Sequence, residues 1–463
     1  MEEKTWRHTA LEKFDVIVVG AGTAGCLAAK TAAKAGLKVC IVEKKPIEEI
    51  GEKICGDAVG RHHFENLKLK PPEGEELEKK ILGIKVYSPN LETVFTVKGE
   101  GLHGYVLNRR NFGQRLVKEA LDAGANLFES ALCLEPIIEK GFVNGILLKH
   151  LKTGKVMRLF SSVVVEATGV SAVLRNKLPD EMEIPQKVDR KDVEACYREI
   201  RQLKDEAEVP ELCEIYLNNK VAPGGYVWIF PKAGSKVNVG LGVAMRGNFP
   251  NPKKRFYSQV ISKPMFDNSL LLSGGAWTVP TRRPLDNMVG NGILIAGDAA
   301  CQVSPIHGGG IGPSMMGGYL AGKTIAEALE KGVPSREALW QYNLRYMEYY
   351  GVKQAGLDVF RIFLLSCQDE DLNYGMKYKL ITEKDLLEAS MGNEIQVRFS
   401  DATMRLFRGI KRVRLLNKLR TTASLMRKVR EWYKNYPATP EGFKSWRKGV
   451  EELFSLVEQK LGR

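Results

Sequence analysis

Apolar runs alternate with helical patterns at the start of the chain. Residues 14–19 (FDVIVV) are rich in β-branched side chains, as expected of a strand buried on both faces of a parallel sheet. Small residues over 24–35 predict a helix that ends at Gly36, and residues 37–43 (LKVCIVE) predict a second strand. This order predicts a β-α-β unit and therefore an α/β fold.

The rest of the chain divides into regions of different periodicity. The further predicted elements are one or two strands over 82–97, a helix over 107–123, a strand over 163–169 (VVVEATG), short strands with one helix over 175–284, a strand over 292–298 (GILIAGD), a helix over 312–331 and mainly helix after 335. The strands over 163–169 and 292–298 have the apolar character of the first strand, so we expect them to return to its sheet.

A chain of 463 residues is too long for one ordinary core. We expect a Rossmann-type nucleotide-binding domain interrupted by an inserted β-sheet domain for substrate, with a helical C-terminal extension. The expected boundaries are 13–80, 105–178 and 285–335 for the first domain, 81–104 and 179–284 for the second, and 336–463 for the third.

The turn after the first strand has the composition of a dinucleotide-binding loop. Gly20 permits the tight turn, Gly22 lets the backbone approach a pyrophosphate, and Gly25 allows the helix to pack closely on the strand. Glu43 follows 18 residues after Gly25, where a ribose-binding carboxylate belongs. The amides at the helix N-terminus would face the phosphates. The alternative is a glycine-rich turn without a ligand.

Cysteine spacing and the N-terminus narrow the class of protein. The eight cysteines are scattered and form no C-x-x-C pair, so we expect neither a zinc site nor an iron–sulfur cluster. The first residues (MEEKTWRH) lack the apolar stretch of a secretory signal, and no apolar run approaches the ~18–20 residues of a membrane span. These features predict a cytoplasmic protein.

Positive charge gathers at the end of the chain. The net charge is +14, and residues 401–463 hold 16 Lys and Arg against 6 Asp and Glu. Such an excess favours an anionic partner: a phospholipid surface, an acidic protein or nucleic acid. No nucleic-acid module is recognisable, so we expect no nucleic-acid partner.

Three motifs resemble the large FAD-dependent family that includes aromatic hydroxylases, flavin halogenases and geranylgeranyl reductases. They are residues 20–25 with Glu43, residues 167–175 (ATGVSAVLR), and residues 297–298 (GD). The resemblance covers about residues 13–335 and implies an FAD cofactor. It also implies that Asp298 holds the ribityl chain, that Arg109 lies near FAD, and that the backbone near Cys133 touches the adenine end.

Two further motifs resemble geranylgeranyl reductases in particular. Residues 53–57 (KICGD) resemble the segment over the flavin, and residues 223–231 (PGGYVWIFP) resemble the P-x-x-Y-x-W-x-F-P signature. The implied activity is FAD-dependent saturation of the geranylgeranyl chains of archaeal membrane phospholipids, with free prenyl diphosphates as the alternative substrate. The implied cofactor-binding residues are Gly20, Gly22, Ala24, Gly25, Glu43, Cys55, Gly56, Asp57, Ala58, Arg109, Cys133, Asp298, Gly310 and Ile311. The implied substrate-binding residues are Pro223, Tyr226, Trp228, Phe230 and Pro231.

The chemistry of an unconjugated alkene requires both a hydride and a proton. Tyr226, Trp228 and Phe230 alternate on a predicted strand and so face one side, either as a core face or as the aromatic wall of an apolar tunnel. Such a wall would stabilise a cation-like carbon by ~1–2 kcal/mol per ring. Cys55 and His307 are candidate proton-handling groups, and Tyr226 and Trp228 complete the expected catalytic set. For Cys55 the alternative is a small structural residue.

A basic amphipathic pattern covers residues 404–420. It predicts a helix that either lies on an anionic bilayer, as a peripheral membrane contact, or packs on the protein with a solvated basic face. The electron donor expected for the flavin is a ferredoxin-like acidic carrier or NAD(P)H.

Other functions of the same fold remain open at this point. An FAD-dependent monooxygenase would usually carry Asp where this chain has Thr168, and a halogenase would show a second tryptophan in the 226–231 motif. An electron-transfer-flavoprotein dehydrogenase would need the cysteine cluster that the sequence lacks. A non-enzymatic prenyl-lipid escort protein is the remaining alternative.

Overall fold

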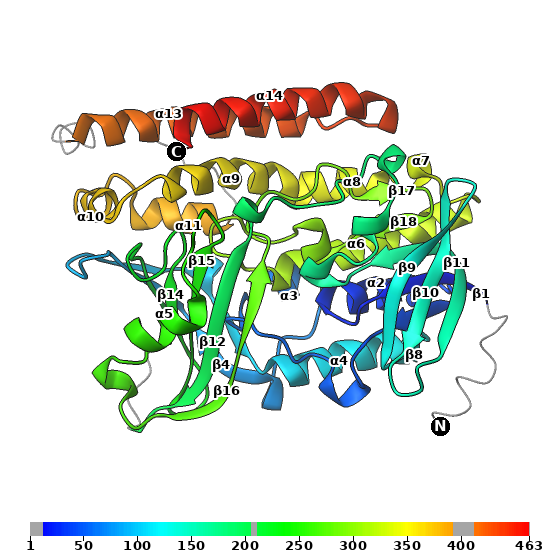
Figure 1. Ribbon diagram of the computed structural model, residues 1–463, viewed down its shortest axis with the longest axis horizontal. Helices are drawn as coiled ribbons and strands as arrows, with labels where there is room; N and C mark the ends of the chain where they lie inside the picture. Colours follow the sequence, from blue (N-terminus) through cyan, green and yellow to red (C-terminus); the bar gives the residue numbers. More distant parts are fainter. Residues whose placement is uncertain (1–12, 205–210, 392–411, 463) are drawn as a thin grey trace.

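The computed structural model describes residues 13–204, 211–391 and 412–462 (Figure 1). The apolar runs at the start of the chain form the middle of an eight-stranded sheet. The order across its main path is β17 (Val289–Gly290), β18 (Ile293–Ile295), β11 (Val156–Glu166), β1 (Lys13–Val19), β2 (Val39–Val42) and β8 (Asn126–Phe128). The pairs from β18 to β8 are parallel, so the predicted return of 163–169 and 292–298 to the first sheet is confirmed.

Helices cover this sheet, and an antiparallel extension prolongs it. β9 (Ala131–Glu139) and β10 (Phe142–His150) continue the sheet from β11. The helices are α2 (Thr23–Lys34), α4 (Arg109–Asp122) and α6 (Ile311–Glu330). α2 and α6 approach closely because Gly318 and Gly322 lack side chains: a Cβ on Gly318 would lie 2.0 Å from the oxygen of Ala24. The predicted helices over 24–35, 107–123 and 312–331 are thus confirmed.

The inserted region forms a second, seven-stranded sheet. Its order is β16 (Leu270–Val279), β12 (Glu194–Gln202), β15 (Lys236–Ala244), β14 (Val227–Pro231), β13 (Leu212–Tyr216), β5 (Gly83–Tyr87) and β6 (Val94–Lys98). All pairs are antiparallel except that of β13 with β5. The helix α5 (Pro252–Gln259) packs on the outer face, where the rings of Phe256 and Tyr197 are 5.1 Å apart. The alternation of the strands leaves the inner face free to line a site.

A small third sheet connects the two larger ones. It contains β3 (Ala58–Gly60), β7 (Gly104–Leu107) and β4 (Leu77–Ile81), and α3 (His62–Asn66) follows β3. Since β3 begins directly after residues 53–57, this sheet places the KICGD motif between the nucleotide-binding sheet and the inserted sheet.

The chain after residue 335 is mainly helical in its described part, as predicted. The helices are α7 (Arg336–Leu339), α8 (Gln341–Tyr346), a π-helical turn (Met347–Gly351), α9 (Val352–Leu365), α10 (Asp369–Lys377), α11 (Glu383–Met391), α13 (Val413–Lys434) and α14 (Phe443–Leu461). Figure 1 shows α13 and α14 as the outermost layer, above α8 and α9. No helix in the described ranges combines the length and the apolar character that crossing a membrane requires.

The predicted amphipathic helix over 404–420 lies partly outside the described residues, which resume at 412. In its described part, Leu416 is buried and Val413 is 55% exposed. Farther along α13, Leu425 and Val429 are buried, and α13 packs against α9. The apolar face of α13 is therefore directed toward the protein.

Candidate active site

The nucleotide-binding turn shows three different uses of glycine. Gly20 has φ of +105°, and a Cβ there would lie 2.4 Å from the oxygen of Ala167. A Cβ on Gly25 would lie 1.8 Å from the oxygen of Gly20, so this position must be glycine for α2 to pack on β1. Around Gly22 an added Cβ would meet nothing within 4 Å. The open space at Gly22 lies at the N-terminus of α2, where a phosphate would be placed.

Glu43 fixes the end of β2 beside this turn. Its carboxylate accepts hydrogen bonds from the backbone N–H of Ala21 at 2.8 Å and of Lys45 at 3.0 Å. The N–H of Ala131 donates to the carbonyl of Glu43 and brings the start of β9 to the same place. Burial raises the pKa of Cys133, on β9, to about 12, so its thiol stays neutral. The predicted contact of the Cys133 backbone with adenine stays a prediction.

Glu166, at the end of β11, organises the second motif. This buried carboxylate accepts from Thr168 Oγ1 at 2.7 Å, from the N–H of Leu174 at 2.8 Å and from the N–H of Arg175 at 2.6 Å. Burial raises its pKa, and these hydrogen bonds act in the opposite direction. The role of Glu166 was not predicted from the sequence, although an acid at the end of an apolar strand is a visible signal.

Asp298 brings distant parts of the chain together. It follows β18, and its Oδ2 lies 2.7 Å from Nζ of Lys53. A Cβ on Gly310 would lie 3.2 Å from Asp298 Oδ1, so the N-terminal end of α6, which begins at Ile311, is adjacent. Three predicted cofactor-binding elements therefore meet: the turn at Asp298, the start of α6, and the segment that contains Lys53.

Residues 53–58 lie over the inner face of the inserted sheet, and we call them the 53–58 segment. The carbonyl of Cys55 accepts from Arg198 Nε at 3.2 Å and from Asn238 Nδ2 at 2.8 Å. Arg198 Nη2 also donates to the carbonyl of Lys53 at 3.2 Å. Strands β12 and β15 of the inserted sheet thus fix the backbone of a segment that lies more than a hundred residues earlier in the chain.

Asp57 provides a second attachment. It has φ of +67°, and its Oδ2 accepts from Asn238 Nδ2 at 2.8 Å and from Lys232 Nζ at 3.1 Å. Lys232 also donates to the carbonyl of Leu107 at 2.9 Å. Both members of the Asp57–Lys232 pair are buried. Arg198, Lys232 and Asn238 were not predicted from the sequence; a polar residue within an apolar strand is the available signal for Asn238.

The three aromatic side chains predicted to share a face do so. The ring centroids of Tyr226 and Trp228 are 6.0 Å apart, and those of Trp228 and Phe230 are 6.4 Å apart. A Cβ on Gly56 would lie 3.0 Å from the Phe230 ring, and a Cβ on Gly240 would lie 2.4 Å from the Trp228 ring. The wall therefore faces the 53–58 segment, and glycines on both sides make room for it.

The polar atoms of two wall residues are already engaged. Tyr226 donates its hydroxyl to the carbonyl of His307 at 2.8 Å, and Trp228 Nε1 donates to Asn238 Oδ1 at 2.9 Å. Burial raises the pKa of Tyr226, so the phenol is neutral. Because the Tyr226 hydroxyl and the Trp228 N–H both donate to groups of the protein, a ligand at the aromatic wall would contact the ring surfaces.

His307 combines an exposed side chain with a lowered pKa. Its side chain is accessible to solvent, yet desolvation, aided by the charge of Lys353, lowers its pKa to about 4. Since the imidazolium is a minor form at neutral pH, His307 is poorly suited to act there as a general acid, and its catalytic role stays a prediction.

Glu194 is a protonatable acid on the same inner face, and it was not predicted from the sequence as a site residue. It lies on β12, four residues before Arg198, and its Oε2 would be 3.1 Å from a Cβ on Gly242. Burial raises its pKa to about 7, while Arg361 and a hydrogen bond with Thr281 act in the opposite direction. The alternation of positions 194 and 198 on β12 was the signal that placed them on one face.

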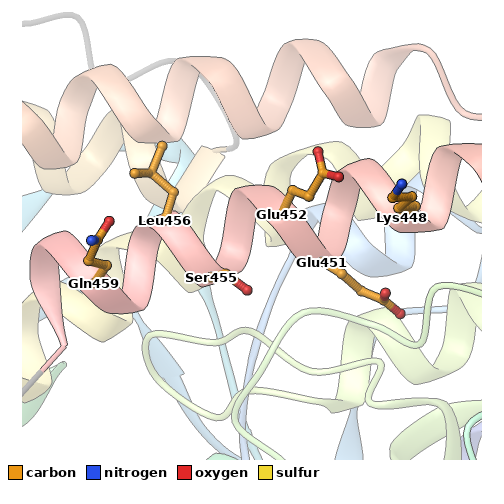
Figure 2. A pocket seen from close by; sticks show the side chains of 6 residues that line it. All are labelled: Lys448, Glu451, Glu452, Ser455, Leu456 and Gln459. Atoms are coloured by element: carbon orange, nitrogen blue, oxygen red, sulfur yellow. The ribbon is translucent and has the colours of Figure 1, made fainter.

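A separate hollow lies on α14, away from these residues. Figure 2 shows the side chains that line it, all from that one helix: Lys448, Glu451, Glu452, Ser455, Leu456 and Gln459. It has no aromatic wall and no glycine-rich turn, so we do not assign the chemistry to it.

The residues present fit a flavin nucleotide. In the described part of the chain, Nε and Nη1 of Arg109 and Oγ of Ser304 are buried without a hydrogen-bond partner in the protein. Arg109 begins α4, and Ser304 lies in the loop before α6. These groups and the open space at Gly22 offer what a polar, phosphate-containing ligand requires.

Comparisons with known families agree with this geometry. Residues 15–49 match the FAD binding domain, and residues 192–294 match the geranylgeranyl reductase catalytic domain. The protein is therefore an FAD-dependent oxidoreductase, and the expected cofactor is confirmed.

Whole-chain relatives define the family more closely. A digeranylgeranylglycerophospholipid reductase of Sulfolobus acidocaldarius is 43% identical over 97% of this chain and 99% of its own. One from Methanothrix thermoacetophila is 33% identical over 78% of this chain and 90% of its own. The chain belongs to the digeranylgeranylglycerophospholipid reductase family.

Solved structures support the fold. A geranylgeranyl bacteriochlorophyll reductase-like protein of Thermoplasma acidophilum has a TM-score of 0.74 at 23% identity and covers 89% of this chain and 99% of its own. The flavin-dependent brominase Bmp2 has a TM-score of 0.62 at 18% identity and covers 86% of this chain and 98% of its own. The expected fold class is confirmed, and flavin halogenases share the fold alone.

Proposed function

We propose that this protein saturates the isoprenoid double bonds of geranylgeranyl chains in a membrane glycerophospholipid. The observation that carries the proposal is the aromatic wall of Tyr226, Trp228 and Phe230 facing the 53–58 segment. A polyprenyl chain presents hydrocarbon surface only, and ring faces complement it. The names of the curated relatives support this substrate class. Free prenyl diphosphates are the alternative.

The residues around the nucleotide-binding turn have roles that follow from their positions. Gly22 and the N-terminus of α2 would receive the pyrophosphate, Glu43 the ribose, and Asp298 the ribityl chain. Arg109 supplies two buried guanidinium nitrogens without a hydrogen-bond partner for the same ligand. When bound, FAD supplies the hydride for the reduction.

The aromatic wall acts on the alkene. It holds the hydrocarbon, excludes water and stabilises positive charge on the carbon that receives the proton, by ~1–2 kcal/mol for a well-placed ring. Because the polar hydrogens of Tyr226 and Trp228 are engaged elsewhere, the wall does not compete for that proton.

Glu194 is our choice for the group that holds the proton. A carboxyl with a pKa of about 7 keeps a substantial protonated fraction at neutral pH, which suits a general acid. Cys55 lies in the 53–58 segment and remains a second candidate, whereas His307 is mainly neutral at this pH.

The proposal also includes an electron donor and a location. A ferredoxin-like acidic carrier suits the net charge of +14, and NAD(P)H is the other donor class to be tried. The protein would work in the cytoplasm, at the inner membrane face. The predicted membrane contact of the basic C-terminal region stays a prediction.

Turnover of the purified flavoprotein tests the proposal. With dithionite as reductant and a detergent-solubilised digeranylgeranyl glycerophospholipid as substrate, mass spectrometry should show products heavier by pairs of hydrogens. In heavy water, each saturated bond should gain solvent deuterium at carbon. Failure to reduce the lipid, with reduction of geranylgeranyl diphosphate instead, would move the assignment to the alternative substrate.

A further inference from the structure

The edge strand of the inserted sheet begins with three exposed leucines. Leu270, Leu271 and Leu272 are 65%, 51% and 52% exposed, and Met265, shortly before them, is 46% exposed. Successive side chains of a strand point to opposite faces, so a packing role would bury at least one of the three. We call these four residues the leucine tip. An exposed apolar cluster of this kind marks an interaction surface.

Basic residues flank the leucine tip. Between positions 252 and 272 the chain has Lys253, Lys254, Arg255 and Lys263 against one acid, Asp267. The first three lie on α5, and Figure 1 shows α5 and the beginning of β16 at the same end of the inserted sheet. Apolar side chains beside cations match an anionic lipid surface, which offers hydrocarbon below a negative headgroup layer. The same cations would repel a second copy of this tip.

The strand that carries the leucine tip also leads into the site. A Cβ on Gly275 would lie 2.7 Å from Ile54 Cδ1, so β16 contacts the 53–58 segment five residues after Leu270. Farther along, Val279 approaches Gly308 in the loop after His307. At ~3.3 Å per residue, Leu270 and Gly275 are about 16 Å apart along the strand.

We propose that the leucine tip enters the surface of an anionic phospholipid bilayer and that a prenyl chain passes along β16 to the aromatic wall. The passage of the chain rests on the proposed function; the docking surface rests on the tip itself. The C-terminal layer is a different surface, on the opposite side of the molecule in Figure 1, and the buried Leu425 and Val429 of α13 face the protein.

Vesicle flotation of the holoprotein tests the docking surface. The wild type should float with phosphatidylglycerol vesicles and much less with phosphatidylcholine vesicles. The variant L270S/L271S/L272S should lose about ten-fold or more of its vesicle binding, because the apolar insertion is removed. The variant K253Q/K254Q should lose about five-fold for each cation removed.

A matched control replaces three equally exposed apolar residues elsewhere, in the variant L151S/V156S/V333S, and should float like the wild type. The tip variant should keep full activity on detergent-solubilised lipid and lose it on lipid in vesicles. Equal flotation of the tip variant and the wild type would overturn the proposal, and so would a tip-dependent dimer that binds no vesicles. Leucine-dependent flotation without any lipid reduction would retain the docking surface and reject the proposed function.

Discussion

The two large sheets of this protein use similar strands for different purposes. In the nucleotide-binding sheet, β1, β2 and β18 are buried, and the ligand-facing features are backbone turns at the strand ends. In the inserted sheet, the strands carry the site on one face: Glu194 and Arg198 on β12, Asn238 on β15 and Trp228 on β14. A short glycine motif therefore specifies the first site, whereas the second requires three strands to assemble before it exists.

The largest effect is expected where the nucleotide-binding turn has no space. Gly25→Val would place a Cβ only 1.8 Å from the Gly20 oxygen. We therefore expect a loss of more than about 4 kcal/mol in folding stability and no bound flavin. Thermal melting and flavin absorbance measure both. Gly22→Ala is the control: it should fold normally because its Cβ meets no atom, and bind FAD less tightly. A yellow, stable Gly25→Val protein would remove the steric role of this turn.

In the inserted sheet the corresponding weak point is electrostatic. Lys232→Met leaves Asp57 buried without its cation, so we expect a cost of about 3–5 kcal/mol in the free energy of unfolding. The double variant D57N/K232M should recover much of this loss. Lys377→Met, at the exposed pair with Glu92, should cost at most about 1 kcal/mol. Denaturant unfolding compares the three, and equal costs at the two pairs would contradict the buried role.

Glu194→Gln should lower kcat by about 100-fold if this carboxyl supplies the proton. The wild-type rate should fall as the pH rises through about 7, since the protonated form of Glu194 is lost above its pKa. This falling limb of the pH–rate profile should be missing in the Glu194→Gln variant. Thr281→Val removes a hydrogen bond that lowers this pKa, so its limb should move to higher pH. Rates measured across pH decide; an unchanged limb in Glu194→Gln assigns the proton elsewhere.

The smallest of these effects concerns one ring of the wall. Trp228→Leu should reduce kcat by about ten-fold, with FAD retained, because one ring stabilises a developing cation by ~1–2 kcal/mol. Trp228→Phe keeps a ring and loses only the hydrogen bond to Asn238, so it should be the milder change. If both variants were equally slow in steady-state turnover, the hydrogen bond would matter rather than the ring.

Sequence patterns predicted the central strands of the nucleotide-binding sheet and the helices that cover it. Gly20, Gly22, Gly25 and Glu43 are local signals, and a strand–helix–strand order gives each a fixed place. The alternation of Tyr226, Trp228 and Phe230 correctly predicted a shared face, because strand periodicity is also local.

The attachments of the 53–58 segment were not predictable in this way. Arg198, Lys232 and Asn238 lie between 143 and 183 residues away from their partners, and nothing in the spacing of the chain indicates such contacts. In the sequence Glu194 is one glutamate among many, and only its burial beside the aromatic wall raises its pKa to about 7. Such properties belong to the assembled sheet rather than to any motif.

The double attachment of the 53–58 segment has a consequence for the order of reduction. Hydrogen bonds from Arg198 and Asn238 join the segment to the inserted sheet, and the bridge from Lys53 to Asp298 joins it to the nucleotide-binding sheet. Swinging the two domains apart would break at least one of these sets of contacts at every turnover. We therefore expect the prenyl chain to translate while the protein stays closed, so that neighbouring double bonds are saturated in sequence and partly reduced lipids carry their remaining double bonds in one block.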